Sequence, residues 1–253
     1  MAPPGKKKTK PIAQSHGVKY AARHSEIVDM AARLFAEKGY SSTSVNDLCE
    51  AAGIGKGGLY YYIGAKEDLL IEIHDRVMEP LLERSLKIAS GPGSAAARLR
   101  MVSEVLLVII FERIEHVWVF LHEYRALTGE RLRRFREGRQ VFERVISDLL
   151  AAGVAEGQFQ VEDLRMTTLA FLNMHNYTYQ WVHPGGRLDP IELSAFYCRL
   201  LFRGLGTTTL DCSGVEEEVV YLRTTLPVTG GGASGVTPES APGAHPRRRS
   251  TPR

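Results

Sequence analysis

The feature that most constrains this chain is a helical hydrophobic period that runs through residues 23–206. Apolar residues recur there at three- and four-residue spacing, which is the pattern of amphipathic helices, and no alternating strand pattern of useful length appears. The sequence therefore predicts an all-α fold. The expected helices cover about 23–38, 44–52, 56–62, 66–89, 95–111, 114–127, 130–152, 163–183 and 189–208.

Both ends of the chain lack this period. Residues 1–20 contain Pro, Gly and several lysines but no acid, and they are predicted to form a disordered basic arm. Residues 209–253 hold a short acidic run and then a low-complexity segment, and they are predicted to be mostly disordered. Between the two ends we expect a small helical domain at 21–66 and a larger one at 67–208.

The composition narrows the class of protein. The chain has 253 residues, 44% of them hydrophobic, so one or two domains with a sizeable core are expected. Its three cysteines are widely spaced and form no CxxC pair, which favours a reducing cytoplasm over a disulfide framework. The N-terminus lacks the apolar segment of a secretory signal. The longest apolar run, 105–111, is too short to span a bilayer, so we expect no membrane association.

The segment 43–66 carries the densest chemical signals. Thr43 can cap a short helix, because its hydroxyl can accept a bond from a free backbone N–H. Gly53 then makes a turn, a second short helix covers 56–62, and Gly64 ends it. Two short helices that are joined by a glycine turn and packed on a longer one predict a helix-turn-helix. The second helix of this motif enters the major groove of DNA.

The start of the second helix is the part that meets the bases. Lys56 can reach guanine O6 and N7 or a phosphate. Gly57 and Gly58 let the backbone come close to DNA, at a cost in helix propensity of about 1 kcal/mol each. A purely structural helix would rarely carry such a pair, so the glycines indicate a close contact.

Three consecutive tyrosines follow, and they point about 100° apart around the helix. Leu59 and Ile63 are expected to face the core. Tyr61 and Tyr62 are then predicted to donate to phosphates, while Tyr60 packs partly inside. Each tyrosine taken singly is more often a solvated surface group, so the functional interpretation depends on the joint arrangement.

Lys66 lies at the start of the next expected helix. Free backbone N–H groups at such a position can bind a phosphate, and the ammonium of Lys66 would add positive charge. The sequence therefore predicts a further backbone contact with DNA at this residue.

The run 23–70 resembles the DNA-binding domain of the TetR family of transcriptional regulators. It shares the threonine start, the glycine turn, the Leu-Tyr block of the second helix and the Lys-Glu-x-Leu exit. The resemblance implies a role in binding operator DNA. The residues at the family's DNA-facing positions are Thr43, Asn46, Lys56, Gly57, Gly58, Tyr60, Tyr61, Tyr62 and Lys66.

Members of the family join this module to a helical domain that binds a small ligand and dimerises through its last two helices. The expected helices 163–183 and 189–208 are amphipathic, so the resemblance implies a homodimer through them. A helix-turn-helix usually needs a dimer to read a two-fold operator. The alternative is that these faces belong to the core of a monomer.

A stripe of polar and aromatic residues interrupts the first of these helices. The stripe consists of Asn173, Asn176, Tyr177, Gln180 and Trp181, at steps of three and four. It could line a ligand pocket or form a polar seam at the dimer interface, and the sequence favours neither. Trp118, His122 and Arg125 complete the predicted ligand set.

The segment 180–193 resembles the W-[YV]-x-P-G-G-x-L motif of TetR regulators of lipid and cholesterol side-chain catabolism. Those repressors release DNA on binding acyl-CoA thioesters, although Gln180 stands where they often have Arg. We therefore expect a repressor that is released by a small hydrophobic or acyl-CoA ligand. The alternatives are a TetR-type repressor that responds to a drug-like lipophilic compound, a helical ligand-binding or dimerisation protein without operator binding, and an activator.

No pattern predicts catalysis, a cofactor or a metal. His116 and His122 are six residues apart, whereas two ligands on one helical face are typically four apart. The chain has no G-x-S-x-G, no P-loop and no paired carboxylates. We therefore expect a protein that is not an enzyme and that has neither a metal nor a cofactor.

Overall fold

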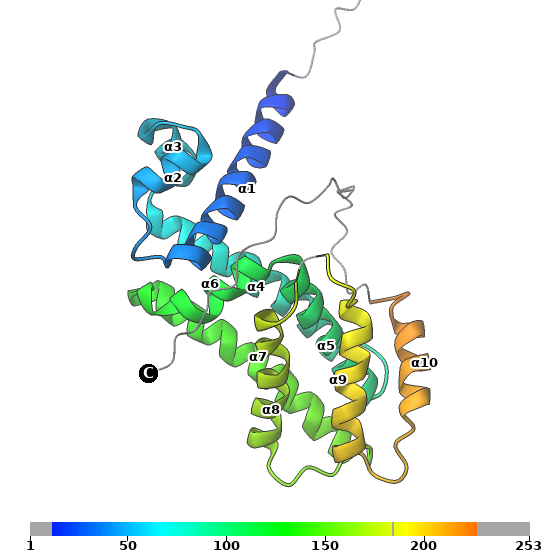
Figure 1. The fold of residues 1–253 in the computed structure, drawn as a ribbon. Helices are drawn as coiled ribbons and strands as arrows, with labels where there is room; N and C mark the ends of the chain where they lie inside the picture. Colours follow the sequence, from blue (N-terminus) through cyan, green and yellow to red (C-terminus); the bar gives the residue numbers. More distant parts are fainter. Residues whose placement is uncertain (1–11, 184, 227–253) are drawn as a thin grey trace, which may run out of the picture.

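The computed structural model describes residues 12–183 and 185–226, and within these ranges it is entirely helical. The described chain forms ten α-helices and two short 3-10 helices, with no β-strand (Figure 1). The expectation of an all-α fold is confirmed. None of the described helices is both long enough and apolar enough to cross a membrane.

The first three helices form the head, residues 12–63, which lies at one end of the molecule (Figure 1). They are α1 (Ile12–Lys38), α2 (Val45–Ala52) and α3 (Lys56–Ile63). The core domain begins at residue 66. It contains α4 (Lys66–Ala89), α5 (Ala95–Glu112), α6 (Ile114–His122), η1 (Glu123–Ala126), α7 (Gly129–Ala155), α8 (Leu164–Asn176), η2 (Tyr177–Gln180), α9 (Pro190–Leu205) and α10 (Cys212–Leu222).

Helix α2 begins one residue later than expected. Ser44 Oγ accepts a hydrogen bond from Asp47 N at 3.1 Å, and Asp47 Oδ2 accepts one from Ser44 N at 2.8 Å. This reciprocal pair is a capping box, which satisfies two free donors at once. Thr43 is not the cap: it is buried, and its hydroxyl donates to Gly39 O at 2.8 Å. The predicted turns hold, because Gly53 and Gly64 have φ of +63° and +69°.

The ends of the chain are more ordered than the sequence suggested. Helix α1 begins at Ile12, so residues 12–20 are helical, whereas the rest of the predicted basic arm, 1–11, lies outside the described residues. Residues 212–222 of the predicted disordered tail form α10, whereas 227–253 again lie outside. Both segments contain contacts with residues distant in the sequence, such as Tyr20 with α3 and Glu216 with α5, and these contacts cannot be read from local composition.

Helix α10 is held by charges that include a residue of the short acidic run in the predicted tail. Arg100 is fully buried, and its guanidinium donates to Glu104 (3.0 Å), Glu216 (2.9 Å) and Ser194 (2.5 Å). Arg223 of the same C-terminal segment donates to both carboxylate oxygens of Glu104. A buried ion pair tolerates desolvation only when its remaining hydrogen-bonding positions are filled, and α10 fills them.

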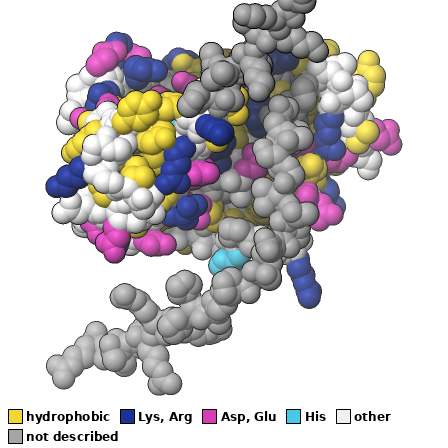
Figure 2. Space-filling view, turned by 90° about the horizontal axis from the view of Figure 1, so that it is seen from above, with side chains coloured by type: hydrophobic (Ala, Val, Ile, Leu, Met, Phe, Trp, Pro, Cys, Tyr) yellow, Lys and Arg dark blue, Asp and Glu magenta, His cyan; other side chains and the backbone are white. Residues whose placement is uncertain are grey.

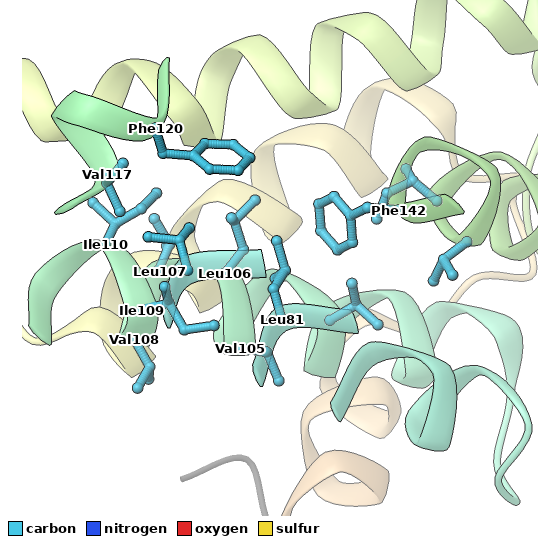
Figure 3. Close-up of a cluster of buried hydrophobic side chains, with 14 of the residues drawn as sticks. Leu81, Val105, Leu106, Leu107, Val108, Ile109, Ile110, Val117, Phe120 and Phe142 are labelled. Atoms are coloured by element: carbon cyan, nitrogen blue, oxygen red, sulfur yellow. The ribbon is translucent and has the colours of Figure 1, made fainter. Parts of the chain in front are cut away.

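Helix α5 lies at the centre of the core domain, and nearly all of its residues are buried. A helix that is apolar on every side has no solvent face, which explains the run 105–110. Figure 3 shows these side chains interleaved with Leu81, Val117, Phe120 and Phe142 from neighbouring helices. Part of this cluster lines the first of the two cavities described below.

Candidate nucleic-acid interface and effector cavities

Helix α3 presents a small exposed surface beyond the packed part of the head. Leu59 and Ile63 face inward, as expected, while Lys56 and both glycines of its first turn are exposed. Asn46 of α2 is exposed as well. In Figure 2, which looks onto the end of the molecule that carries the head, hydrophobic and basic side chains lie together on the left. This combination suits a nucleic acid, because basic side chains can bind its phosphates while other exposed groups contact its bases.

The two glycines of α3 have no packing role among the described residues. A Cβ added at Gly57 would meet no heavy atom of these residues within 4 Å, and one at Gly58 would make only ordinary contact with Ile54 at 3.6 Å. Neither residue has a positive φ. Their cost in helix propensity is therefore not offset by any internal contact, which favours an external reason for their presence.

The tyrosines of α3 meet an aromatic partner that the sequence did not predict. Tyr20 of α1 stacks on Tyr62, with ring centroids 5.0 Å apart, and meets Tyr61 edge-on at 5.5 Å. Its hydroxyl also lies 3.4 Å from the carbonyl oxygens of both residues. Tyr62 is consequently half-buried, whereas Tyr61 stays 70% exposed and Tyr60 46% exposed. Residue 20 falls within the predicted disordered arm, so this aromatic contact could be expected only if α1 was known to begin before residue 20.

Two residues of the predicted DNA-facing set are used within the head. Thr43 is buried, so it offers no group to this surface. The ammonium of Lys66 donates to Tyr40 O at 2.5 Å and lies 4.2 Å from the centroid of the Tyr40 ring. Burial lowers the pKa of Lys66. One backbone N–H at the start of α4 is also already paired, because Ala65 N donates to Asp68 Oδ2 at 2.8 Å.

Several polar contacts join the head to the core domain. Arg76 of α4 binds Asp29 of α1 at 2.9 Å. The carboxylate of Glu123, in η1, accepts from Tyr40 N at 3.1 Å. Within the core domain, Arg131 of α7 binds Glu67 and Asp68, in the first turn of α4, at 3.0 and 3.1 Å. A displacement of α4 or η1 would therefore reach the head directly, and a displacement of α7 would reach it through the first turn of α4.

An apolar cavity of about 60 Å³ lies among α4, α5, α6, α7 and α8. Its polar lining comes from Arg139, Glu143 and Asn176, and the rest is apolar. Figure 3 shows part of that apolar wall. The lining includes Val77, Met78, Leu81, Leu106, Ile109, Ile110, Val117, Phe120, Leu121, Phe142 and Leu172.

A second cavity, of about 150 Å³, lies between α4 and α7, and we call it the His74 cavity. It shares Met78 with the apolar cavity. His74 is only 4% exposed, and burial lowers its pKa to about 4. This residue was not among those that the sequence singled out. Its signal was a histidine between Ile73 and Val77, inside the apolar stripe of α4.

The predicted ligand residues are mostly not brought together. Of the stripe, Asn176 alone lines one of the two cavities, whereas Asn173, Tyr177, Gln180 and Trp181 are exposed. The reason is that α8 ends at Asn176 and a 3-10 helix follows, so the stripe does not stay on one helical face. Buried Thr178, which bonds Tyr197 of α9 at 3.0 Å, ties this tighter turn to the core.

The remaining three predicted ligand residues lie elsewhere. Trp118 stacks on His122 with ring centroids 4.5 Å apart, and His122 Nε2 lies 3.1 Å from the Tyr179 hydroxyl. Arg125 is exposed. None of the three lines either of the two cavities.

Helices α8 and α9 carry large apolar side chains on their outer surface. Met166 of α8 is exposed, as are Phe196 and Leu200 of α9. Phe196 and Leu200 lie four residues apart on α9, and exposed apolar residues that are grouped in this way are typical of a protein–protein interface. They lie on the two helices that the sequence predicted to form the dimer.

The chain matches two family models. Residues 27–73 match the bacterial regulatory proteins of the tetR family, and residues 92–205 match the tetracyclin repressor-like C-terminal domain. The HTH-type transcriptional repressor KstR2 of Rhodococcus jostii is 29% identical over 194 residues, which cover 74% of this chain and 93% of that protein.

Solved structures agree with this match. The TetR-family regulator PfmR from Thermus thermophilus is 30% identical, with a TM-score of 0.65 over 72% of this chain and 99% of that one. AibR, solved in complex with isovaleryl coenzyme A and operator DNA, is 26% identical, with a TM-score of 0.62 over 71% and 98% of the two chains. The chain therefore belongs to the TetR family, whose members are dimeric transcriptional regulators that bind operator DNA and respond to small-molecule effectors.

Proposed function

We propose that this chain is a dimeric repressor that leaves its operator when an acyl-CoA thioester occupies the core domain. The observation that carries the proposal is the apolar cavity walled by α4, because α4 is separated from α3 by only two residues. The relatives support the effector class: KstR2 is named a repressor, and AibR was solved with isovaleryl coenzyme A and operator DNA.

The cavity suits the acyl part of such a ligand. Its lining is almost wholly aliphatic and aromatic, and burial of apolar surface contributes roughly 25 cal/mol per Å². Arg139 supplies a positive charge at the wall, and it is exposed to solvent. An acyl chain could therefore be buried while the polar coenzyme stays outside.

The route from cavity to DNA runs through α4. Val77, Met78 and Leu81 of this helix line the apolar cavity, and Arg76 beside them holds Asp29 of the head. A ligand that needs more room would move α4 and change the distance between the two α3 helices of the dimer. An operator fits only when these helices are about one DNA turn apart, roughly 34 Å. The effector acts through its different affinity for the two arrangements. Such a regulator works where the chromosome lies, in the cytoplasm.

The test begins with an operator selected from a random DNA library by the full-length protein. Its dissociation constant is then measured with and without a panel of acyl-CoAs, with free CoA as the control. We expect at least one acyl-CoA to weaken operator binding about tenfold or more, and free CoA to have no effect.

A cavity-filling variant supplies the matched control. Leu106→Phe adds volume inside the apolar cavity, so it should keep operator binding and lose the response to the acyl-CoA. If the whole panel leaves operator affinity unchanged, the effector class is wrong while the DNA-binding role stands. If a lipophilic compound without CoA releases the operator instead, the effector belongs to that class of compound.

A further inference from the structure

His74 is a buried polar residue whose hydrogen-bonding capacity is unused. Both of its ring nitrogens are buried and have no hydrogen-bond partner among the residues that the structure describes. Its neighbours are the rings of Phe120 and Phe135, whose centroids lie 5.3 and 5.0 Å away. A neutral imidazole has one donor and one acceptor, and leaving them unpaired in an apolar site is unfavourable. An apolar residue of similar size would avoid this cost, so the imidazole calls for a partner other than the described residues.

The His74 cavity has the size of a single ring. A cavity of about 150 Å³ lined by apolar side chains can hold a molecule such as benzene. The inner wall is formed by His74, Leu127 and Phe135, all of which are buried. The inner part of a six-membered ring would therefore meet apolar surface, with one hydrogen-bonding group beside it.

The charges around this cavity are balanced. Arg131 and Arg134 line its outer part together with Asp75 and Glu79. Arg131 is already bound to carboxylates of α4, and Arg134 lies close enough to lower the pKa of Asp75 against the larger effect of burial, which raises it. Neither an anion nor a cation is favoured by such a rim, so the group that meets His74 is neutral.

We propose that the His74 cavity binds a ring that carries a neutral hydroxyl or carbonyl oxygen, and that His74 recognises this oxygen. The binding site stands on the cavity and on the unpaired imidazole. Its role as part of the effector site rests on the proposed function. An occupant would lie against Arg131, which joins α7 to the first turn of α4, and against Met78, which also lines the apolar cavity.

Met78 and Gly138 make the site adaptable. A Cβ at Gly138 would lie 3.0 Å from Met78 Cγ, so the glycine leaves room for the thioether where α4 and α7 meet. Methionine is unbranched and repacks readily. Its movement would open a passage between the two cavities, so a ligand longer than one ring could extend from one into the other.

Phenol and toluene test the proposal, because they differ only in a hydroxyl and a methyl group on the same ring. Their affinities are measured by calorimetry on the full-length wild-type protein, on His74→Leu and on His183→Leu. His183 is exposed and lines neither of the two cavities, so its variant is the matched control. We expect the preference for phenol over toluene to fall about fivefold in His74→Leu, as for one lost hydrogen bond, and to be unchanged in His183→Leu.

A second measurement uses only the wild-type protein, so it does not depend on whether a variant folds. In wild-type protein with ¹⁵N-labelled histidine, phenol should shift the imidazole resonances of one buried histidine and toluene should shift them much less. The proposal is overturned if neither compound binds up to its solubility, or if His74→Leu keeps the wild-type preference for phenol. Operator release by acyl-CoA could survive either result, so failure of this site differs from failure of the proposed function.

Discussion

Recognition helix α3 and core helix α7 both carry glycines in helical positions, where each costs about 1 kcal/mol relative to alanine. In α7 the reason is internal: a Cβ at Gly153 would lie 2.2 Å from the ring of Phe159, which is itself buried against Phe202. In α3 no such neighbour exists for Gly57 among the described residues. The same residue type thus indicates tight packing in one region and a surface kept free for a partner in the other.

The largest expected effect comes from the packed glycine. Gly153→Ala should lower the free energy of unfolding by about 1–3 kcal/mol, because the Phe159 ring would have to leave its site. Urea denaturation of the purified protein measures this. Unchanged stability would show that this end of α7 is loosely packed and would remove the contrast with α3.

The exposed glycine should respond in the opposite sense. Gly57→Ala should raise the free energy of unfolding by up to ~1 kcal/mol, since it improves helix propensity without a clash. The same change should weaken operator binding about tenfold, or ~1.4 kcal/mol, if DNA approaches the backbone there. Stability and DNA affinity are measured on one preparation. A variant that is more stable and binds equally well would exclude a close contact at this residue.

Lys56→Ala should weaken operator binding less than Gly57→Ala does. The way in which the loss depends on salt and on DNA sequence identifies the kind of contact. If the exposed ammonium binds a phosphate, affinity should fall severalfold for all sequences and the salt dependence of binding should lose a slope of about 1. Titrations at several salt concentrations measure the slope, with selected and unrelated DNA. A loss confined to the selected operator would instead assign Lys56 to a base.

The smallest effect on operator binding is expected at Tyr20, a residue of α1 that packs on the tyrosines of α3. Tyr20→Ala removes the ring that packs on Tyr61 and Tyr62, so operator binding should weaken a few-fold. Tyr20→Phe keeps the ring and should restore most of the affinity. Equal losses in the two variants would mean that the hydroxyl, and not the ring, holds α3.

Much of the head could be predicted because its signals are local. Helix periodicity, the turn at Gly53 and the inward positions of Leu59 and Ile63 each depend on residues only a few positions apart. The predicted N-cap of α2 was one residue too early, because local signals do not show which of two adjacent hydroxyls is the cap. Thr43 and Ser44 both carry a hydroxyl, but only Ser44 forms the reciprocal pair of bonds with Asp47, whereas the Thr43 hydroxyl donates to Gly39 O.

In the core domain, local patterns were a poorer guide. A stripe that included Asn173 and Trp181 was expected to share one face, but the helix ends between them. Likewise, the acidic run near Glu216 gave no sign that it would order α10, because its partner Arg100 lies more than a hundred residues away. The pairing depends on how α5 and α10 come together.

The sequence by itself determined the all-α fold, the helix-turn-helix and the exposed glycines of α3, because periodicity and turn chemistry act over three or four residues. The tertiary structure decided which polar residues meet which partners. It placed the Lys66 ammonium on Tyr40 and left His74 unpaired beside a ring-sized cavity. Cavities and buried pairs arise where helices distant in sequence pack imperfectly or exchange charges, and no local pattern encodes that geometry.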